Sequence, residues 1–67
     1  MLNPRYIVVK QESGWQIVQA GRHFPANYPN MTQALRSAIA LAQWATTAGR
    51  RPAVLIRDED GRFFTVW

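Results

Sequence analysis

Two strand–turn–strand patterns with apolar residues on both faces flank a single amphipathic helix in this chain. Residues 6–19 and 53–67 each have the spacing of a hairpin, and residues 31–48 between them have the spacing of a helix. One helix covers only one face of a sheet. The other face, which carries Val, Ile and aromatic side chains, is therefore expected to contact a second chain or some other partner.

The turn of each predicted hairpin decides which side chains share a face. A tight turn at Ser13-Gly14 places on one face Tyr6, Val8, Trp15 and Ile17, and on the other Ile7, Val9, Val18 and Ala20. A turn at Asp60-Gly61 places on one face Val54, Ile56, Phe63 and Thr65, and on the other Ala53, Leu55, Phe64 and Val66. The pattern leaves open which face of each hairpin meets the helix, and it leaves the strand order open.

The helix is expected to begin near Asn30 and to end before Gly49. Asn30 with Gln33 three residues later resembles a capping box, and Thr32 is a competing cap. Gly49 readily adopts the left-handed conformation that ends helices. Small side chains one turn apart let the helix backbone approach a sheet closely, namely those of Ala34, Ala38 and Ala42.

Residues 21–30 are expected to form a connecting loop, because Pro25 and Pro29 are incompatible with a central strand. Phe24 and Tyr28 would anchor this loop. The sequence therefore predicts one α+β domain over residues 1–67. Its two layers, in the order strand-strand-helix-strand-strand, are a four-stranded, mainly antiparallel sheet and one helix packed on one face.

The small size of the chain favours self-association. A domain of 67 residues buries only about 60% of the surface that its unfolded chain exposes. The chain has no Cys and one His, so neither a disulfide nor a thiolate metal site is expected to compensate, and a homodimer is the predicted remedy. We expect no membrane span and no cofactor. Residues 1–5 lack the charged start of a signal peptide, which favours the cytoplasm.

The sequence resembles the short bacterial proteins of the domain-of-unknown-function family 2188. The residues that carry the resemblance are Tyr6-Ile7-Val8-Val9, Gly14-Trp15 with Ile17, Thr32 with Ala38 and Ala42, Val54-Leu55-Ile56, and Asp60-Gly61-Arg62. The loop at residues 21–30 and the aromatic ending at residues 63–67 depart from the family pattern. That family has no assigned activity, so the resemblance implies the order of the elements and a bacterial origin, and it implies no mechanism.

A net charge of +4 makes nucleic acid the alternative partner. Three of the four acids cluster at residues 58–60, and the basic residues are spread along the chain. Single-stranded nucleic acid would stack on aromatic side chains and pair with Arg side chains on the uncovered sheet face. The candidate basic residues are Arg5, Arg50, Arg51, Arg57 and Arg62, and the candidate aromatic residues are Tyr6, Trp15, Phe63 and Trp67. Packing in the core is the competing role for most of these aromatic side chains.

The sequence offers no catalytic or metal-binding motif. His23 has no nucleophile or carboxylate close to it in the sequence. The acidic run at residues 58–60 lacks the alternating spacing of a calcium loop and is predicted to be a solvated turn. We therefore expect an interaction module, and we do not expect an enzyme.

Trp44 lies at the margin of the apolar face of the predicted helix. Its indole ring either folds over the edge of its own core or contacts a partner, because large aromatic side chains are enriched at interface centres. The predicted interface residues are Trp44, Tyr6, Trp15, Phe63 and Trp67.

Overall fold

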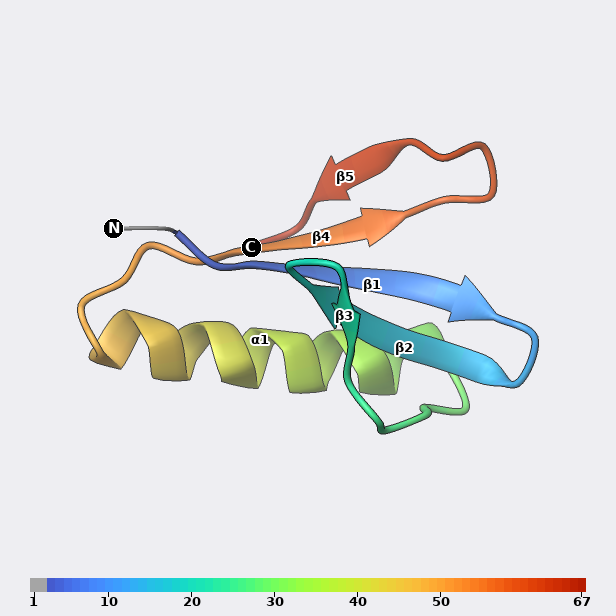
Figure 1. The fold of residues 1–67 in the computed structure, drawn as a ribbon, viewed down its shortest axis with the longest axis horizontal. Helices are drawn as coiled ribbons and strands as arrows, with labels where there is room; N and C mark the ends of the chain where they lie inside the picture. The colour runs from blue at the N-terminus through green and yellow to red at the C-terminus, as the bar shows by residue number, and fades with distance from the viewer. Residues whose placement is uncertain (1–2) are drawn as a thin grey trace.

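One helix packs against a twisted five-stranded sheet in the computed structural model, which describes residues 3–67 (Figure 1). The elements are β1 Arg5–Gln11, β2 Gly14–Gln19, β3 Arg22–His23, α1 Met31–Thr47, β4 Ala53–Arg57 and β5 Phe63–Thr65. The signal-peptide expectation rests partly on Met1 and Leu2, which lie outside the described residues. Within residues 3–67, no helix has the length and apolar character needed to cross a membrane.

The sheet is mixed, with the strand order β3-β2-β1-β4-β5. Strands β1 and β4 run parallel in its centre, from the Arg5–Ala53 pair to the Val8–Ile56 pair, and the other neighbours are antiparallel. The α+β class and the order of the main elements are thus confirmed, whereas the prediction of four mainly antiparallel strands was inexact. Helix α1 supplies the long crossover connection that parallel neighbours require, and β3 adds a short fifth strand.

The first hairpin has the predicted faces, but its turn is Glu12-Ser13 and not Ser13-Gly14, because Gln11 pairs with Gly14. Val8 pairs with Ile17 and Lys10 pairs with Trp15, so Tyr6, Val8, Trp15 and Ile17 share one face. This face packs on α1. Ala20 was predicted to lie on the opposite face, but it lies in the turn after β2 with a φ of 53°. The β2 residue that pairs with Val9 on that face is Gln16.

The predicted faces of the second hairpin were wrong for β5. Ile56 pairs with Phe64 and Leu55 pairs with Thr65, so Phe64 shares the face of Ile56. The loop is one residue longer than a tight turn at Asp60-Gly61, because the Asp58 N–H donates to the Arg62 carbonyl (2.9 Å) and encloses residues 59–61. Such loops need a left-handed residue at their end, and Gly61 supplies it with a φ of 82°. The extra residue exchanges the two faces of β5.

The core lies between α1 and the middle of the sheet. Its buried members are Tyr6, Val8, Ile17, Ala34, Ala38, Ala42 and Val54. The three alanines lie one turn apart and are fully buried, so the helix backbone approaches the strands closely, as predicted. This close approach leaves the larger side chains to fill the flanks of the interface, among them Leu35, Ile39, Leu41 and Ile56.

Both ends of α1 are capped by neighbouring residues. The Asn30 Oδ1 accepts a hydrogen bond from the Gln33 N–H (2.9 Å), so Asn30 is the cap among the two candidates. Gly49 has a φ of 84°, and the Arg50 N–H returns to the Ala45 carbonyl (3.0 Å). The predicted limits of the helix are therefore confirmed to within one residue.

The segment at residues 21–30 is more ordered than a simple connecting loop. Arg22 and His23 pair with β2 as strand β3. Further along, Trp15 and Tyr28 exchange two backbone hydrogen bonds, each 2.8 Å long. Phe24 and Tyr28 pack against the core, which confirms their predicted role as anchors.

Candidate functional site

Strand β5 is the part of the sheet that the rest of the fold leaves uncovered. Among residues 3–67, α1 contacts β1, β2 and β4 and contacts neither β3 nor β5. Figure 1 shows β5 at the upper margin of the sheet and α1 below the central strands. Within the described part of the chain, strand β5 therefore lacks a covering layer, and its outer edge has no neighbouring strand in the sheet order.

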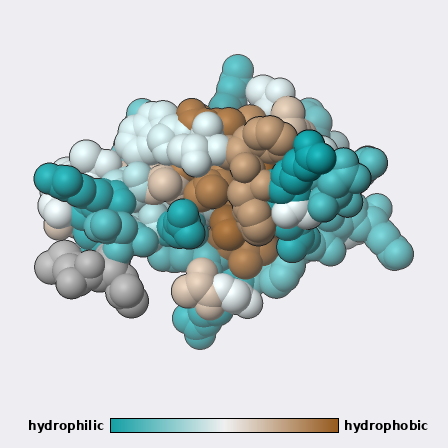
Figure 2. Space-filling view, turned by 90° about the horizontal axis from the view of Figure 1, so that it is seen from above, coloured by the Kyte–Doolittle hydropathy of each residue, from teal (hydrophilic) through white to brown (hydrophobic). Residues whose placement is uncertain are grey.

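Large apolar side chains gather at this uncovered strand. The exposed fractions of Phe63, Phe64, Val66 and Trp67 lie between 43 and 54%. Figure 2 views the molecule from the side on which β5 lies, and it shows a band of hydrophobic side chains flanked by hydrophilic ones. We call residues 63–67 the β5 edge. No residue of this edge is charged.

The backbone of the β5 edge offers free hydrogen-bonding groups. The Val66 N–H donates to the Val54 carbonyl (2.8 Å), and the Asp58 N–H donates to the Arg62 carbonyl. Hydrogen-bonded positions alternate along an antiparallel pair, so residues 62, 64 and 66 face β4. The N–H and C=O groups of Phe63 and Thr65 consequently point away from β4, toward the open edge.

The opposite edge of the sheet differs in the polarity of its side chains. Strand β3 has two residues, Arg22 and His23, and both are exposed and polar. Natural sheets protect their edges with very short strands and charged side chains. The sheet therefore has one protected edge and one unprotected edge, and only the unprotected one suits the addition of another strand.

The face of the sheet opposite α1 is less open than the sequence predicts. Val9 and Leu55 point away from the helix, yet Val9 is only 1% exposed and Leu55 is also buried. Ile7 and Val18 are half-buried. On the sheet itself, the exposed apolar side chains are thus concentrated at the β5 edge, with a smaller contribution from Ile7 and Val18 on this face.

The predicted platform of aromatic and Arg side chains does not form. Tyr6 is buried and Trp15 is half-buried, and both lie on the face that packs on α1. Tyr6 and Trp15 therefore have the competing role in core packing, because the register of β1 and β2 turns them toward the helix. Phe63 and Trp67 remain exposed at the β5 edge.

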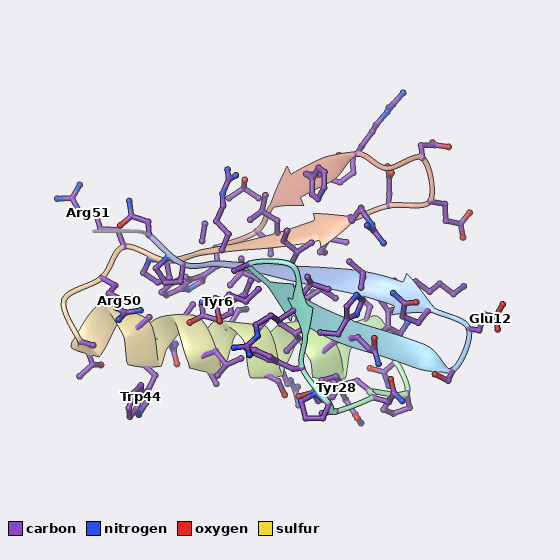
Figure 3. All side chains as sticks on the ribbon, in the orientation of Figure 1. Tyr6, Glu12, Tyr28, Trp44, Arg50 and Arg51 are labelled. Atoms are coloured by element: carbon purple, nitrogen blue, oxygen red, sulfur yellow. The ribbon has the colours of Figure 1, made fainter. Side chains whose placement is uncertain are left out.

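The five candidate Arg residues are all exposed but lie in different places. Arg5 and Arg57 lie on the sheet face opposite α1, at the start of β1 and the end of β4. Arg62 belongs to the turn before β5, and Arg50 and Arg51 follow α1. Figure 3 shows Arg50 and Arg51 at one end of the molecule, far from Glu12 at the other. They do not surround one aromatic surface.

Trp44 points away from the sheet (Figure 3), and its exposed fraction is 78%. It borders a shallow apolar groove between α1 and the segment at residues 21–30, lined also by Phe24, Tyr28 and Leu41. The interpretation that its ring covers its own core is therefore wrong. A contribution of Trp44 to association stays a prediction.

We expect Trp44→Ala to change the free energy of unfolding by less than about 0.5 kcal/mol, because substitutions of exposed side chains have small effects. Urea denaturation measures this value. A loss of 2 kcal/mol or more, on the scale of roughly 2–5 kcal/mol for truncated core side chains, would contradict the exposed position of the ring.

His23 and the acidic run have structural partners. The His23 Nδ1 lies 2.9 Å from the Gln16 Oε1, and the Gln16 Nε2 donates to the Asn27 Oδ1 (2.7 Å). The Asp58 Oδ1 accepts from the N–H groups of Asp60 (2.9 Å) and Arg62 (2.8 Å), which confirms the predicted turn. Within residues 3–67, no three His, Asp or Glu side chains are grouped in a way that could hold a metal ion.

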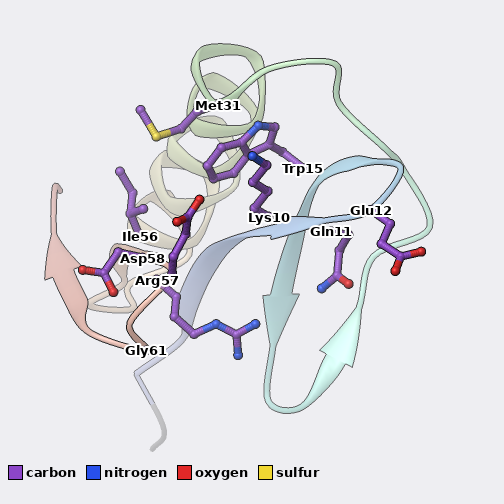
Figure 4. A pocket seen from close by; sticks show the side chains of 10 residues that line it. Lys10, Gln11, Glu12, Trp15, Met31, Ile56, Arg57, Asp58 and Gly61 are labelled. Carbon is purple, nitrogen blue, oxygen red and sulfur yellow. The ribbon is translucent and has the colours of Figure 1, made fainter.

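A depression at the end of the sheet collects side chains of mixed character (Figure 4). Trp15 and Met31 form its apolar part, and Lys10 lies beside Trp15 as its cross-strand neighbour. Both hairpin turns contribute acidic residues, including Glu12 and Asp58. The lining combines both signs of charge without a grouping typical of catalysis, so this depression does not define a reactive site.

Searches of family models, curated proteins and solved structures found no match to this chain. The resemblance to the domain-of-unknown-function family 2188 therefore stays a prediction, and the function must be argued from the structure itself.

The sequence identified Phe63 and Trp67 as candidates but missed Phe64, Thr65 and Val66. The missed signal lies in the turn. A three-residue loop over residues 59–61 that ends in the left-handed Gly61 predicts that Phe64 shares a face with Ile56. The absence of charged residues after Arg62 is typical of an unprotected strand.

Proposed function

We propose that this protein is a small, non-enzymatic interaction module of the cytoplasm that self-associates through the β5 edge. The observation that carries the proposal is the combination of an outer strand whose far edge has no partner among residues 3–67 with four half-exposed apolar side chains on or directly after that strand. Both features are disfavoured on a free monomer, because an open apolar edge is a template for pairing with another chain.

The size of the domain supports the same conclusion. The helix and the central strands bury few large side chains completely, namely Ile17, Val8, Val9 and Val54. A core of this size gives a small domain only marginal stability. Burial of Phe63, Phe64, Val66 and Trp67 against a second chain would add apolar contact without enlarging the chain.

The nucleic-acid alternative has less support. Two of its four aromatic candidates, Tyr6 and Trp15, face α1, and the Arg residues do not converge on the remaining two. Weak binding of single-stranded nucleic acid through the net positive charge stays a prediction.

The test replaces a single backbone donor at the β5 edge. The Thr65 N–H points away from β4, so Thr65→Pro removes an outward hydrogen bond while it leaves the pairing of β5 with β4 in place. We expect the wild-type chain to have twice its monomer mass in light scattering at micromolar concentration. The dissociation constant of Thr65→Pro should rise roughly 30-fold, since each copy loses a hydrogen bond of about 1 kcal/mol.

Thr65→Val is the matched control, because it keeps the backbone N–H and favours a strand. It should dimerise as the wild-type chain does. A wild-type chain that is monomeric at several hundred micromolar would refute the proposal, and so would equal dissociation constants for Thr65→Pro and Thr65→Val.

A further inference from the structure

The β5 edge has a geometry that specifies how two copies would pair. Resting on the proposed self-association, we infer that two β5 strands pair antiparallel about a twofold axis at Phe64. The acidic turn at residues 58–60 of each copy then lies beside Arg50 and Arg51 of the other copy. The pairing joins the two sheets into one continuous sheet. The hydrogen-bonding positions of β5 and the distribution of charge both favour this arrangement.

The hydrogen-bonding positions select the register. Phe63 and Thr65 carry the outward N–H and C=O groups of β5. An axis at Phe64 places Phe63 of one copy opposite Thr65 of the other, and the reverse, so every outward group of β5 has a partner. The two Phe64 side chains then face each other in a close, non-hydrogen-bonded pair, where aromatic rings stabilise a sheet.

Moving the axis by one residue in either direction would require backbone N–H or C=O groups that already take part in a hydrogen bond. An axis at Phe63 places Thr65 opposite Gly61, whose N–H donates to the Asp58 carbonyl (3.1 Å). An axis at Thr65 places Phe63 opposite Trp67, whose carbonyl accepts from the Val54 N–H (3.1 Å). In the register centred on Phe64, all outward N–H and C=O groups of Phe63 and Thr65 pair with one another and do not depend on these occupied groups.

The charges select the antiparallel direction. The acidic turn lies at one end of the β4–β5 hairpin, and Arg50 and Arg51 precede β4 at the other end (Figures 1 and 3). Antiparallel pairing reverses the second copy, so its Gly61 comes opposite Trp67. A parallel arrangement would instead bring the two acidic turns to the same end of the pair, where their charges repel.

The separation suits contact between long side chains. Trp67 is next to the start of β4, because its carbonyl accepts from the Val54 N–H. The turn of the second copy therefore lies about two strand spacings, roughly 10 Å, from the start of β4. Glu59 and Asp60 are exposed, as are Arg50 and Arg51, so the side chains are free to meet across this distance.

Cysteine pairing tests the register directly, because the natural chain has no Cys. In the inferred register Phe64 faces itself and Arg62 faces Val66. Residues that face each other in this way have Cα atoms about 4.5 Å apart, which permits a disulfide. Under oxidised glutathione, Phe64→Cys should form covalent dimers at least about ten times faster than Arg62→Cys or Val66→Cys alone.

A mixture of Arg62→Cys and Val66→Cys should form the mixed dimer as fast as Phe64→Cys forms its own. Both variants in this mixture keep the Phe64 side chain, so the mixture tests the register even where Phe64→Cys weakens the pairing. Faster self-linkage of Arg62→Cys or Val66→Cys than of Phe64→Cys would overturn the register.

Charge reversal tests the orientation. Arg50→Glu with Arg51→Glu, or Glu59→Arg with Asp60→Arg, should each weaken the homodimer at least about fivefold. An equimolar mixture of the two double variants should restore the wild-type dissociation constant, because both contacts of the mixed dimer again join opposite charges. Asp58 is left unchanged because its carboxylate holds the turn.

The failures of the two proposals are distinguishable. A monomeric wild-type chain refutes self-association itself. A dimer that Thr65→Pro disrupts, but that shows neither rescue by mixing nor preferential linkage at Phe64, refutes the register and leaves the β5 edge as the interface.

Discussion

Gly14→Ala is expected to remove roughly 3 kcal/mol from the free energy of unfolding. Gly14 has a φ of 137°, which side-chain-bearing residues rarely adopt, and a Cβ atom there would lie 2.6 Å from the Tyr28 carbonyl oxygen. A strained backbone conformation costs about 1–3 kcal/mol, and displacement of Tyr28 weakens two hydrogen bonds of about 1 kcal/mol each. Urea denaturation at a fixed protein concentration measures the loss.

Gly21→Ala is the matched control for this prediction. Gly21 also has a positive φ, of 76°, but nothing lies within 4 Å of the position of its Cβ atom. We expect a loss of about 1 kcal/mol from backbone strain alone. Equal losses for both variants would show that the contact between Gly14 and Tyr28 has no energetic role.

Ile17→Ala is expected to lower the free energy of unfolding by about 2–5 kcal/mol, the range for large-to-small changes in a packed core. Ile17 is fully buried between the sheet and α1. A domain of this size has a total stability of roughly 3–10 kcal/mol. The variant should therefore lose a large part of its stability, which would appear as a lower urea midpoint and a lower thermal midpoint in circular dichroism.

Ile7→Ala makes the same chemical change on the other face of the sheet. Ile7 is half-buried and lies opposite Val18, away from the helix. We expect a loss of roughly 1 kcal/mol, because less apolar surface is lost and the site is open to water. A larger loss for Ile7→Ala than for Ile17→Ala would mean that the helix covers the opposite face.

The sequence was sufficient to predict the elements that depend on local signals alone. The cap at Asn30, the left-handed Gly49 and the spaced alanines of α1 are local features, and the helix lies within one residue of its predicted limits. The faces of the first hairpin were also predicted correctly. Its turn lies at Glu12-Ser13, one residue earlier than predicted, and this shift moves the pairing by two positions, which leaves the faces unchanged.

Long-range pairing could not be predicted in the same way. No local pattern distinguishes a strand that pairs parallel with β1 from one that pairs antiparallel with it, since both are short apolar runs. The side of the sheet that meets α1 depends on this pairing. The sequence consequently left open whether Tyr6 and Trp15 belong to the core or to the uncovered face, and the register places them on the helix side.

The candidate site was predicted in kind and only partly in its residues. The expectation of an uncovered apolar surface holds for β5, where Phe63 and Trp67 are exposed. One additional residue in the loop at residues 59–61 exchanged the faces of β5, which side-chain alternation alone does not reveal.

The parallel pair in the centre of the sheet also governs how the chain folds. Val54 and Ile56 complete the packing around α1, and they reach β1 only after the intervening hairpin and helix have been closed into a loop. Closing a long loop has an entropic cost that precedes any gain from contact, and it slows folding. The first hairpin and α1 can form early and locally, but they remain without a complete core. On the ribosome, cooperative folding would therefore wait until β4 has emerged, and the β5 edge would be the last part of the sheet to form.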